Sequence, residues 1–298
     1  MVLESLTNAY EAEQKPKNIF LHASIYTIVG LTLALWTFPE YASIVMVFFI
    51  ALASVPLLYT IIRYEEDKDY NSKKELPLLK EHSKAILAYF ILFAGITITL
   101  TAAFLILPEQ TLPTLFQAQA ETFEQINPHH NVFAEQQTTT VRAQQNFEQQ
   151  ISLFSKIFMN NFRVMILAIL FSFAYGAGAI FILVWNASVI ALAAGYTIRT
   201  NIAGLATMEG TQGLADYLSI GAHTIFIRYG IHGTIEILAY MVAALAGGII
   251  SVAVIRHHYK TEAFENIIID TADLILIAIG LLVLAGAWEV WITPALAL

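Results

Sequence analysis

Long apolar runs constrain this chain more than any other feature of its sequence. Runs of about 20 apolar residues are long enough to cross a bilayer as helices. They recur along the chain, at residues 19–38, 41–62, 85–107, 162–185, 231–255 and 267–292. Only 13% of the residues are charged, whereas soluble domains carry about 25%. The sequence therefore predicts an all-α, polytopic transmembrane helix bundle.

Composition and missing motifs exclude several classes of function. The chain has no cysteine, which rules out disulfides and thiolate chemistry. Its formal net charge of −8 argues against a nucleic-acid partner. The sequence contains no Gly-rich phosphate loop, HExxH or GxSxG motif. We therefore expect a protein without a cofactor and without catalytic residues, which has the lipid bilayer around it.

The placement of Lys and Arg predicts the orientation of the spans. These residues are frequent before the first span, in the loop 63–84 and in the turn 256–260, whereas the longer region 108–156 has only Arg142 and Lys156. By the positive-inside rule, the N-terminus, the loop 63–84 and the turn 256–260 are cytoplasmic, and the region 108–156 is external. The chain must then cross outward between 185 and 231, and only the weak segment 187–206 can do so. We expect seven crossings in the plasma membrane, with the N-terminus cytoplasmic and the C-terminus outside. The alternative is six crossings with a broken or re-entrant segment at 187–225.

Three parts follow from this topology. Residues 1–107 form an N-terminal three-span unit with the charged cytoplasmic loop 63–84, and residues 157–298 form a C-terminal bundle of about four spans. Between them, residues 108–156 carry apolar side chains at helical spacing, such as Phe116 and Phe123, then Phe147 and Ile151. This pattern predicts an external amphipathic helical hairpin whose second helix runs into the next span. We expect a protein partner to bind there.

Ionisable residues at membrane depth are the candidate site. His232 and Glu236 lie four residues apart and share one face of a helix. As a functional pair they would relay protons or provide two metal ligands. As a structural pair, Glu236 is favoured by the helix dipole and His232 bonds a neighbouring helix. We favour the structural interpretation because two ligands do not complete a zinc site. Glu289, between Trp288 and Trp291, lies at the same predicted depth.

Other polar and small residues complete the candidate list. We expect Asn160 or Asn161 to cap the fourth span, and Asn186 to cap the next helix or fix a turn. A further group lies in or beside the Gly-rich connection and is a candidate pore or cavity lining: Arg199, Glu209, Asp216, His223 and Arg228. Small residues four apart allow close helix packing, within one chain or between copies in a homo-oligomer. These pairs are Ala174 and Gly178, Ala191 and Gly195, Ala243 and Gly247, and Ala244 and Gly248.

The C-terminal half resembles the stage II sporulation protein M family of integral membrane proteins. The resemblance covers about residues 155–298 and is carried by the Asn160–Asn161 pair, Asn186, the His232-Gly233-x-x-Glu236 signature, Glu289 and Pro294. It implies a multi-pass helical protein without established catalysis. The bacterial namesake acts as a membrane scaffold that holds peptidoglycan-degrading partners. The resemblance carries over His232 and Glu236 as signature residues only.

Three functions remain open at this point. We favour a non-enzymatic membrane scaffold in which His232, Glu236 and Glu289 form a buried polar clasp between helices. The second is a transporter or channel-like protein that moves protons, cations or a small solute through a polar cavity. The third is an intramembrane metal-dependent hydrolase that uses His223, His232, Glu236 and Glu289.

Overall fold

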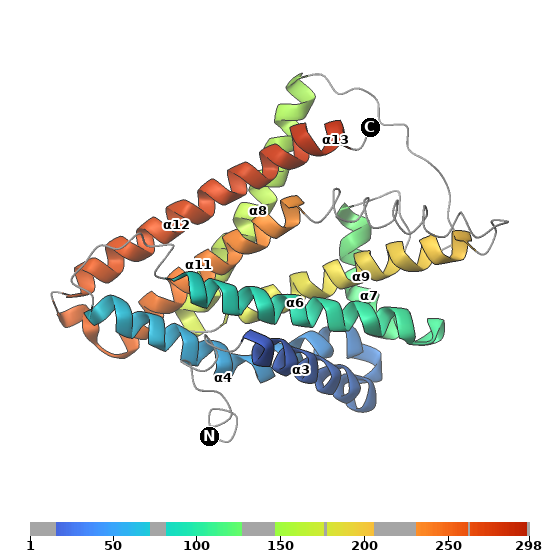
Figure 1. Ribbon diagram of the computed structural model, residues 1–298, viewed down its shortest axis with the longest axis horizontal. Helices are drawn as coiled ribbons and strands as arrows, with labels where there is room; N and C mark the ends of the chain where they lie inside the picture. The colour runs from blue at the N-terminus through green and yellow to red at the C-terminus, as the bar shows by residue number, and fades with distance from the viewer. Residues whose placement is uncertain are drawn as a thin grey trace.

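The structure is a computed structural model, and it is built from helices (Figure 1). It describes residues 16–71, 82–126, 147–175, 178–205, 231–261 and 263–296. The long helices are α3 (Pro16–Thr37), α4 (Ala42–Asn71), α6 (Ser83–Ile106), α7 (Leu112–Ile126), α8 (Phe147–Tyr175), α9 (Ile180–Leu205), α11 (Ile231–Ile255) and α12 (Ala263–Ala287). After α12, the chain continues as a π-helical turn, η5 (Trp288–Ile292), and a short helix, α13 (Thr293–Leu296).

Seven of these helices are long and apolar enough to cross a membrane, as the sequence predicted. Only α7 is not among them. The fifth is α9, which is one unbroken helix of 26 residues. This continuity favours the seven-crossing prediction over a broken segment, although residues 206–225 lie outside the described part of the chain.

The boundary between the fourth and fifth spans differs from the prediction. We expected the fourth span to end at Trp185, but α8 ends at Tyr175 and α9 begins at Ile180. The sequence between them contains Gly176 and Gly178, and glycine is the poorest helix former after proline. Apolar content alone hides this boundary, because the apolar run continues through it.

The predicted aqueous loop 63–84 is also corrected by the structure. Helix α4 continues to Asn71, and the side chains of Glu65 and Glu66 are fully buried. Charged side chains are almost never fully buried unless they are paired with another group. The partners of Glu65 and Glu66 include residues from distant segments, which are described below.

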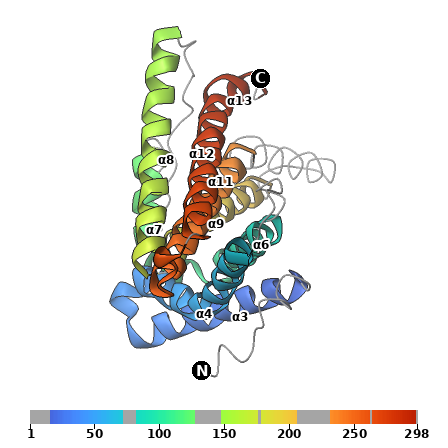
Figure 2. The ribbon, with the colours of Figure 1, turned by 90° about the vertical axis from the view of Figure 1, so that its left-hand side faces the viewer.

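The centre of the bundle is α11. In its most apolar stretch of 18 residues 83% are buried, against at most 50% in the corresponding stretch of any of the other six spans. It packs against α8 and against α12, which lies in front of it in Figure 2, and it also contacts α4 and α6. A Cβ atom on Gly247 would lie 2.7 Å from the Ile169 carbonyl oxygen, and Ser172 Oγ donates to the Ala244 carbonyl oxygen at 2.7 Å. Close approach of α8 and α11 thus depends on the small residues of α11.

The small-residue pairs are therefore used mainly within the chain. Gly195 of α9 packs on Phe104 of α6, where an added Cβ would lie 2.6 Å from the ring. Gly248 is buried beside Gly247. Of the four pairs, only Ala174 and Gly178 keep an exposed or half-buried position.

Among the described residues helix α7 is not packed along α8, and residues 127–146, which would join the two helices of the predicted hairpin, lie outside the described part of the chain. Helix α7 lies across the bundle and packs on α4 and α9 (Figure 1). Phe116 and Phe123 are buried there, and Gln119 Nε2 donates to the Ser43 carbonyl oxygen at 3.1 Å. Its apolar face therefore packs on the chain's own bundle. The second predicted helix is the start of α8, which runs unbroken into the span.

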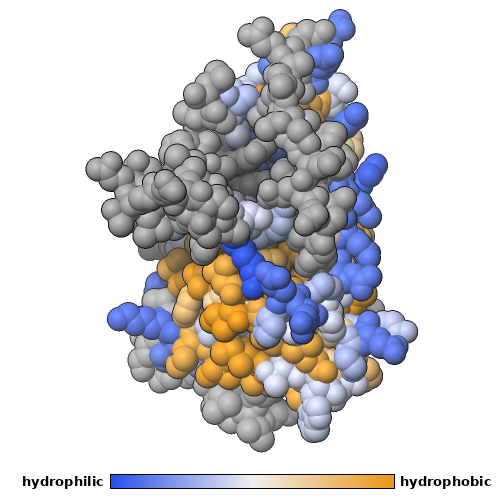
Figure 3. Space-filling model, turned by 90° about the vertical axis from the view of Figure 1, so that its right-hand side faces the viewer, coloured by the Kyte–Doolittle hydropathy of each residue, from blue (hydrophilic) through white to orange (hydrophobic). Residues whose placement is uncertain are grey.

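Large apolar side chains cover much of the outside of the bundle. On α3 the exposed residues include Leu21, Ile28 and Trp36. A hydrophobic patch is also visible on the face drawn in Figure 3. Soluble monomers rarely expose apolar surfaces of this kind, whereas such surfaces suit contact with lipid.

Candidate functional site

A polar cluster joins α11 to α8 near the first turns of α11, and we call it the Glu236 cluster. It comprises Asn161, His232, Glu236, Tyr240 and Glu289. Asn161 Nδ2 donates to Glu236 Oε1, and Tyr240 Oη donates to Asn161 Oδ1 at 2.9 Å. These two bonds fix the direction of the Asn161 amide, because only its nitrogen donates and only its oxygen accepts. The side chains of α8 and α11 are therefore locked in one register.

Helical spacing explains how α11 presents this cluster. His232, Glu236 and Tyr240 follow one another at intervals of four residues and share one face. Tyr240 is 2% exposed and His232 is 9% exposed. The predicted bond from His232 to a neighbouring helix does not form within the described residues, where His232 Nδ1 has no hydrogen-bond partner.

Glu289 joins the cluster from the end of the last span. It lies on the π-helical turn η5, close enough to Glu236 for the two charges to interact. π-helical turns are rare and often occur at functional sites. The common depth of Glu236 and Glu289 stays a prediction. Glu236 is bonded to Asn161 instead of His232, so the clasp has different members from those predicted.

The asparagines do not act as caps. Asn160 and Asn161 lie in the interior of α8, which begins at Phe147. An N-cap must lie at the first turn, where backbone N–H groups lack partners. The amphipathic stretch before Asn160 continues the helix upstream, so these residues meet no such groups. Asn186 lies inside α9, and its Nδ2 donates to the Ile182 carbonyl oxygen at 2.8 Å.

The remaining candidates are dispersed. Arg199 of α9 donates through Nη2 to the Leu107 carbonyl oxygen at 3.3 Å, at the end of α6. Gly233 has open space around it, and Pro294 lies in α13. Glu209, Asp216, His223 and Arg228 lie outside the described residues. Among the residues that are described, no group of three or more His, Asp or Glu is placed to hold a metal ion.

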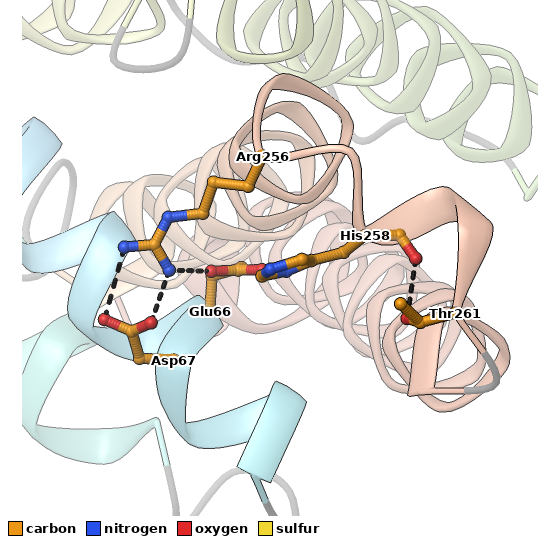
Figure 4. Close-up of polar contacts among 5 residues, drawn as sticks. All are labelled: Glu66, Asp67, Arg256, His258 and Thr261. Carbon is orange, nitrogen blue, oxygen red and sulfur yellow. Dashed lines mark hydrogen bonds and ion pairs between the residues drawn. The ribbon is translucent and has the colours of Figure 1, made fainter.

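A second cluster lies at the opposite end of α11, and we call it the Glu66 cluster. It comprises Glu65, Glu66 and Asp67 of α4 with Arg256 and His258. Arg256 Nη1 donates to Glu66 Oε2 at 2.6 Å and also to Asp67 Oδ1, while His258 Nδ1 lies 2.5 Å from Glu66 Oε1 (Figure 4). The His258 ring stacks on Tyr70 with 4.1 Å between the ring centres. Both oxygens of the buried Glu66 carboxylate therefore meet nitrogen groups from the α11–α12 turn.

The neighbouring Glu65 points to a different helix. Its two oxygens lie 2.5 Å from Lys68 Nζ and 2.6 Å from His82 Nδ1, and His82 directly precedes α6. The end of α4 thus contacts both α6 and the α11–α12 turn through adjacent carboxylates. The hydrogen bond to Asp67 is the main reason that the pKa of Arg256 lies above its usual value, and the nearby Glu66 charge adds to it. The guanidinium therefore stays charged whenever the protein is folded.

The sequence prediction missed this second cluster. The signal was present, since 63–84 and 256–260 were both assigned to the cytoplasmic side. A local sequence pattern does not reveal which acidic residue pairs with which basic residue when the two are 190 positions apart, as Glu66 and Arg256 are. From Glu236 to Arg256 the helix rises about 30 Å, at 1.5 Å per residue. The two clusters are therefore separated by about the thickness of the hydrocarbon core.

Comparison with known proteins gives one match. A protein-family model described as Stage II sporulation protein M matches residues 90–294. The match begins well before residue 155, where the resemblance in the sequence began, and it includes most of α6 and all of α7. No curated protein and no solved structure matches the chain.

Proposed function

Because the chain belongs to the stage II sporulation protein M family, it is a multi-pass membrane protein, and we propose that it is a non-enzymatic scaffold. On this proposal, the bundle holds one surface in a fixed place, and a protein partner binds that surface at the membrane. The Glu236 and Glu66 clusters would keep the bundle rigid from its two ends. The observation that carries the proposal is the exposed start of α8.

Helix α8 is longer than a membrane span requires. Its 29 residues extend about 43 Å, whereas the hydrocarbon core is about 30 Å thick. One face of its first turns packs inward. Phe154 lies 5.5 Å from Trp291 between ring centres, and Trp291 Nε1 donates to Gln150 at 3.2 Å. This contact holds the start of α8 against η5, so that the helix is a rigid platform.

Another face of the same turns is apolar and uncovered. Phe147 is 69% exposed and Ile151 is 48% exposed, and their spacing of four places them on one face. We call these two residues the α8 docking face. Since the apolar face of α7 packs on the bundle, this face is the exposed apolar part of the predicted hairpin within the described residues. Two apolar anchors on a helix suit insertion into an apolar groove of another protein.

Site-specific photo-crosslinking tests this proposal. A photoreactive residue is placed at Phe147 or Ile151 in the full-length protein in its native membrane. Both positions should trap the same protein, and Ile151→Asp should abolish the crosslink from position 147. Leu167 is a matched control, because it is an exposed apolar residue on the same helix inside the span. Crosslinks only to lipid at all three positions would overturn the proposal.

We also propose the plasma membrane as the location, with the N-terminus cytoplasmic and the C-terminus outside. Arg256, Lys68 and Lys260 support this orientation, because they gather at the Glu66 end. The α8 docking face and the Glu236 cluster would then lie toward the outer side.

A further inference from the structure

The outward face of α8 carries polar side chains within a membrane-spanning helix. Lys156, Asn160 and Arg163 lie inside α8 and its candidate span, and all three are exposed. Their spacing of four and three residues places them on one face of the helix. Met165 and Ser172, which are buried in the bundle, lie on the opposite face. Helix α8 stands at the edge of the bundle in Figure 2, so this polar face is directed away from the other helices.

The two positive charges on this face have no counter-charge within the described part of the chain. Neither Lys156 nor Arg163 makes a hydrogen bond or an ion pair with a described residue. The acid of the same helix, Glu148, precedes Lys156 by eight residues, which is about 12 Å along the axis. A charged side chain at membrane depth is costly unless an opposite charge meets it. An anion from outside the chain would remove this cost.

The position of these residues along α8 places them at and below the level of the lipid head groups. Lys156 lies about 28 Å before the end of α8 at Tyr175, which nearly equals the thickness of the hydrocarbon core. Arg163 lies about 10 Å further into the membrane than Lys156. Helical side chains tilt toward the N-terminus, and long basic side chains extend toward the interface. Both tendencies direct the Arg163 guanidinium toward Asn160 and Lys156.

The same face of α8 becomes apolar beyond Arg163. Leu167 is 47% exposed and Leu170 is 54% exposed, and they follow Arg163 by four and seven residues. The face is therefore charged at the head-group end and apolar toward the membrane centre. A phospholipid has the same order, with a phosphate above its acyl chains. A soluble anion would match the charges only, and an apolar protein groove would match the leucines only.

We propose that this face of α8 binds one anionic phospholipid. Lys156, Asn160 and Arg163 hold its phosphate, and an acyl chain lies along Leu167 and Leu170. The two cations attract the phosphate, and Asn160 Nδ2 donates a hydrogen bond to one of its oxygens. A zwitterionic head group adds a cation that these residues repel, so the face favours a head group with net negative charge. The α8 docking face lies on another side of the helix, and the proposal does not depend on the scaffold function.

Photo-crosslinking to lipid tests the proposal at the site itself. The full-length protein is placed in nanodiscs with equal amounts of phosphatidylglycerol and phosphatidylcholine that have the same acyl chains. A photoreactive residue replaces Leu167, and mass spectrometry identifies the class of lipid that it traps. Ile28 is the matched position, because it is 56% exposed on α3 and samples the bulk lipid. We expect phosphatidylglycerol to be enriched about fivefold at position 167 relative to position 28, the effect of about one basic residue on an anionic lipid.

Substitutions of the basic residues complete the experiment. Lys156→Gln combined with Arg163→Gln should reduce the enrichment at Leu167 to the level at Ile28, whereas Arg163→Lys should keep most of it because the charge remains. Lys260→Gln is the charge-matched control, because Lys260 is exposed at the other end of the bundle, and it should change nothing. Equal ratios at the two positions in the wild type would overturn the proposal, and so would an enrichment that survives the loss of both charges. A crosslink from Leu167 to a protein, including a second copy of this chain, would overturn it as well.

Discussion

At the scale of single residues, Asn161 connects the two helices that make up the core of the site. Its nitrogen donates to Glu236 and its oxygen accepts from Tyr240. Both partners lie on α11, at positions 236 and 240, so one amide spans a full turn of the neighbouring helix. The adjacent Asn160 is exposed. Asn160 and Asn161 appear as one motif in the sequence, but Asn161 is buried and Asn160 faces solvent or lipid.

Replacing the buried asparagine should destabilise the bundle. Asn161→Ala leaves Glu236 and Tyr240 without this partner, and an unsatisfied buried group costs about 1–3 kcal/mol. Asn160→Ala should change the free energy of unfolding by less than about 0.5 kcal/mol, as exposed positions do. Reversible unfolding in mixed micelles measures both. Equal effects of the two substitutions would show that the Asn161 bonds do not stabilise the fold.

At the scale of elements, the contact between α8 and α11 depends on the absence of a side chain at one position. A Cβ atom at Gly247 would lie 2.7 Å from the Ile169 carbonyl oxygen and 3.1 Å from Ser172 Cβ. Backbone atoms cannot rotate away as a flexible side chain can, so the two helices would have to separate. By contrast, Gly280 of α12 has no atom within 4 Å of an added Cβ.

The two glycines should therefore respond differently to the same substitution. Gly247→Ala should destabilise the protein by about 1–3 kcal/mol, the usual cost of overpacking a core. Gly280→Ala should be neutral or stabilising by up to about 1 kcal/mol, because alanine is the better helix former. The same unfolding measurement compares them. A stabilising effect of Gly247→Ala would contradict the close approach of α8 and α11.

The Glu66 cluster links α4 to the turn between α11 and α12. Removing Arg256 leaves the fully buried Glu66 without its strongest cationic partner. Arg256→Met should lower the free energy of unfolding by about 3 kcal/mol. This value is the lower end of the range for breaking a buried ion pair, and we choose it because the Arg256 side chain is 21% exposed. Lys260→Met, a nearby exposed change, should cost less than about 0.5 kcal/mol.

The raised pKa of Arg256 adds a pH prediction for the same pair. A cation whose pKa is raised in the folded state contributes stability at every pH below its unfolded value, which for arginine exceeds 12. The difference in unfolding free energy between wild type and Arg256→Met should therefore persist between about pH 7 and pH 9. Loss of the difference within that window would contradict a link through a charged guanidinium.

At the scale of the whole molecule, the sequence was informative where a local pattern decides the structure. Apolar length predicted the spans, and the positive-inside rule required the weak fifth span that is α9. The pairing of Asn161 with Glu236 and of Glu66 with Arg256 was not predictable in this way. Each joins residues at least 75 positions apart, and no local pattern specifies which distant side chain is met.

Local polarity also misled where tertiary contacts override it. The acidic run Glu65, Glu66 and Asp67 is typical of an aqueous loop, yet it extends a helix, because His82 before α6 and Arg256 of the α11–α12 turn lie against it. The apolar face of α7 is typical of a free amphipathic helix, yet it packs on the chain's own bundle. Sites of this kind become visible only when the helices are assembled.

Seven crossings would place the Glu66 cluster on one side of the membrane and the α8 docking face on the other. The chain has no cysteine, so single-cysteine variants carry one thiol each. Labelling with a membrane-impermeant maleimide in sealed vesicles of known orientation tests the topology most directly. Cysteines at Lys17 and Lys260 should react from the cytoplasmic side only, and cysteines at Gln110, Glu148 and Ile292 from the opposite side only. If the cysteine at position 260 reacts from the same side as the one at position 148, then α9 does not cross, and the account fails.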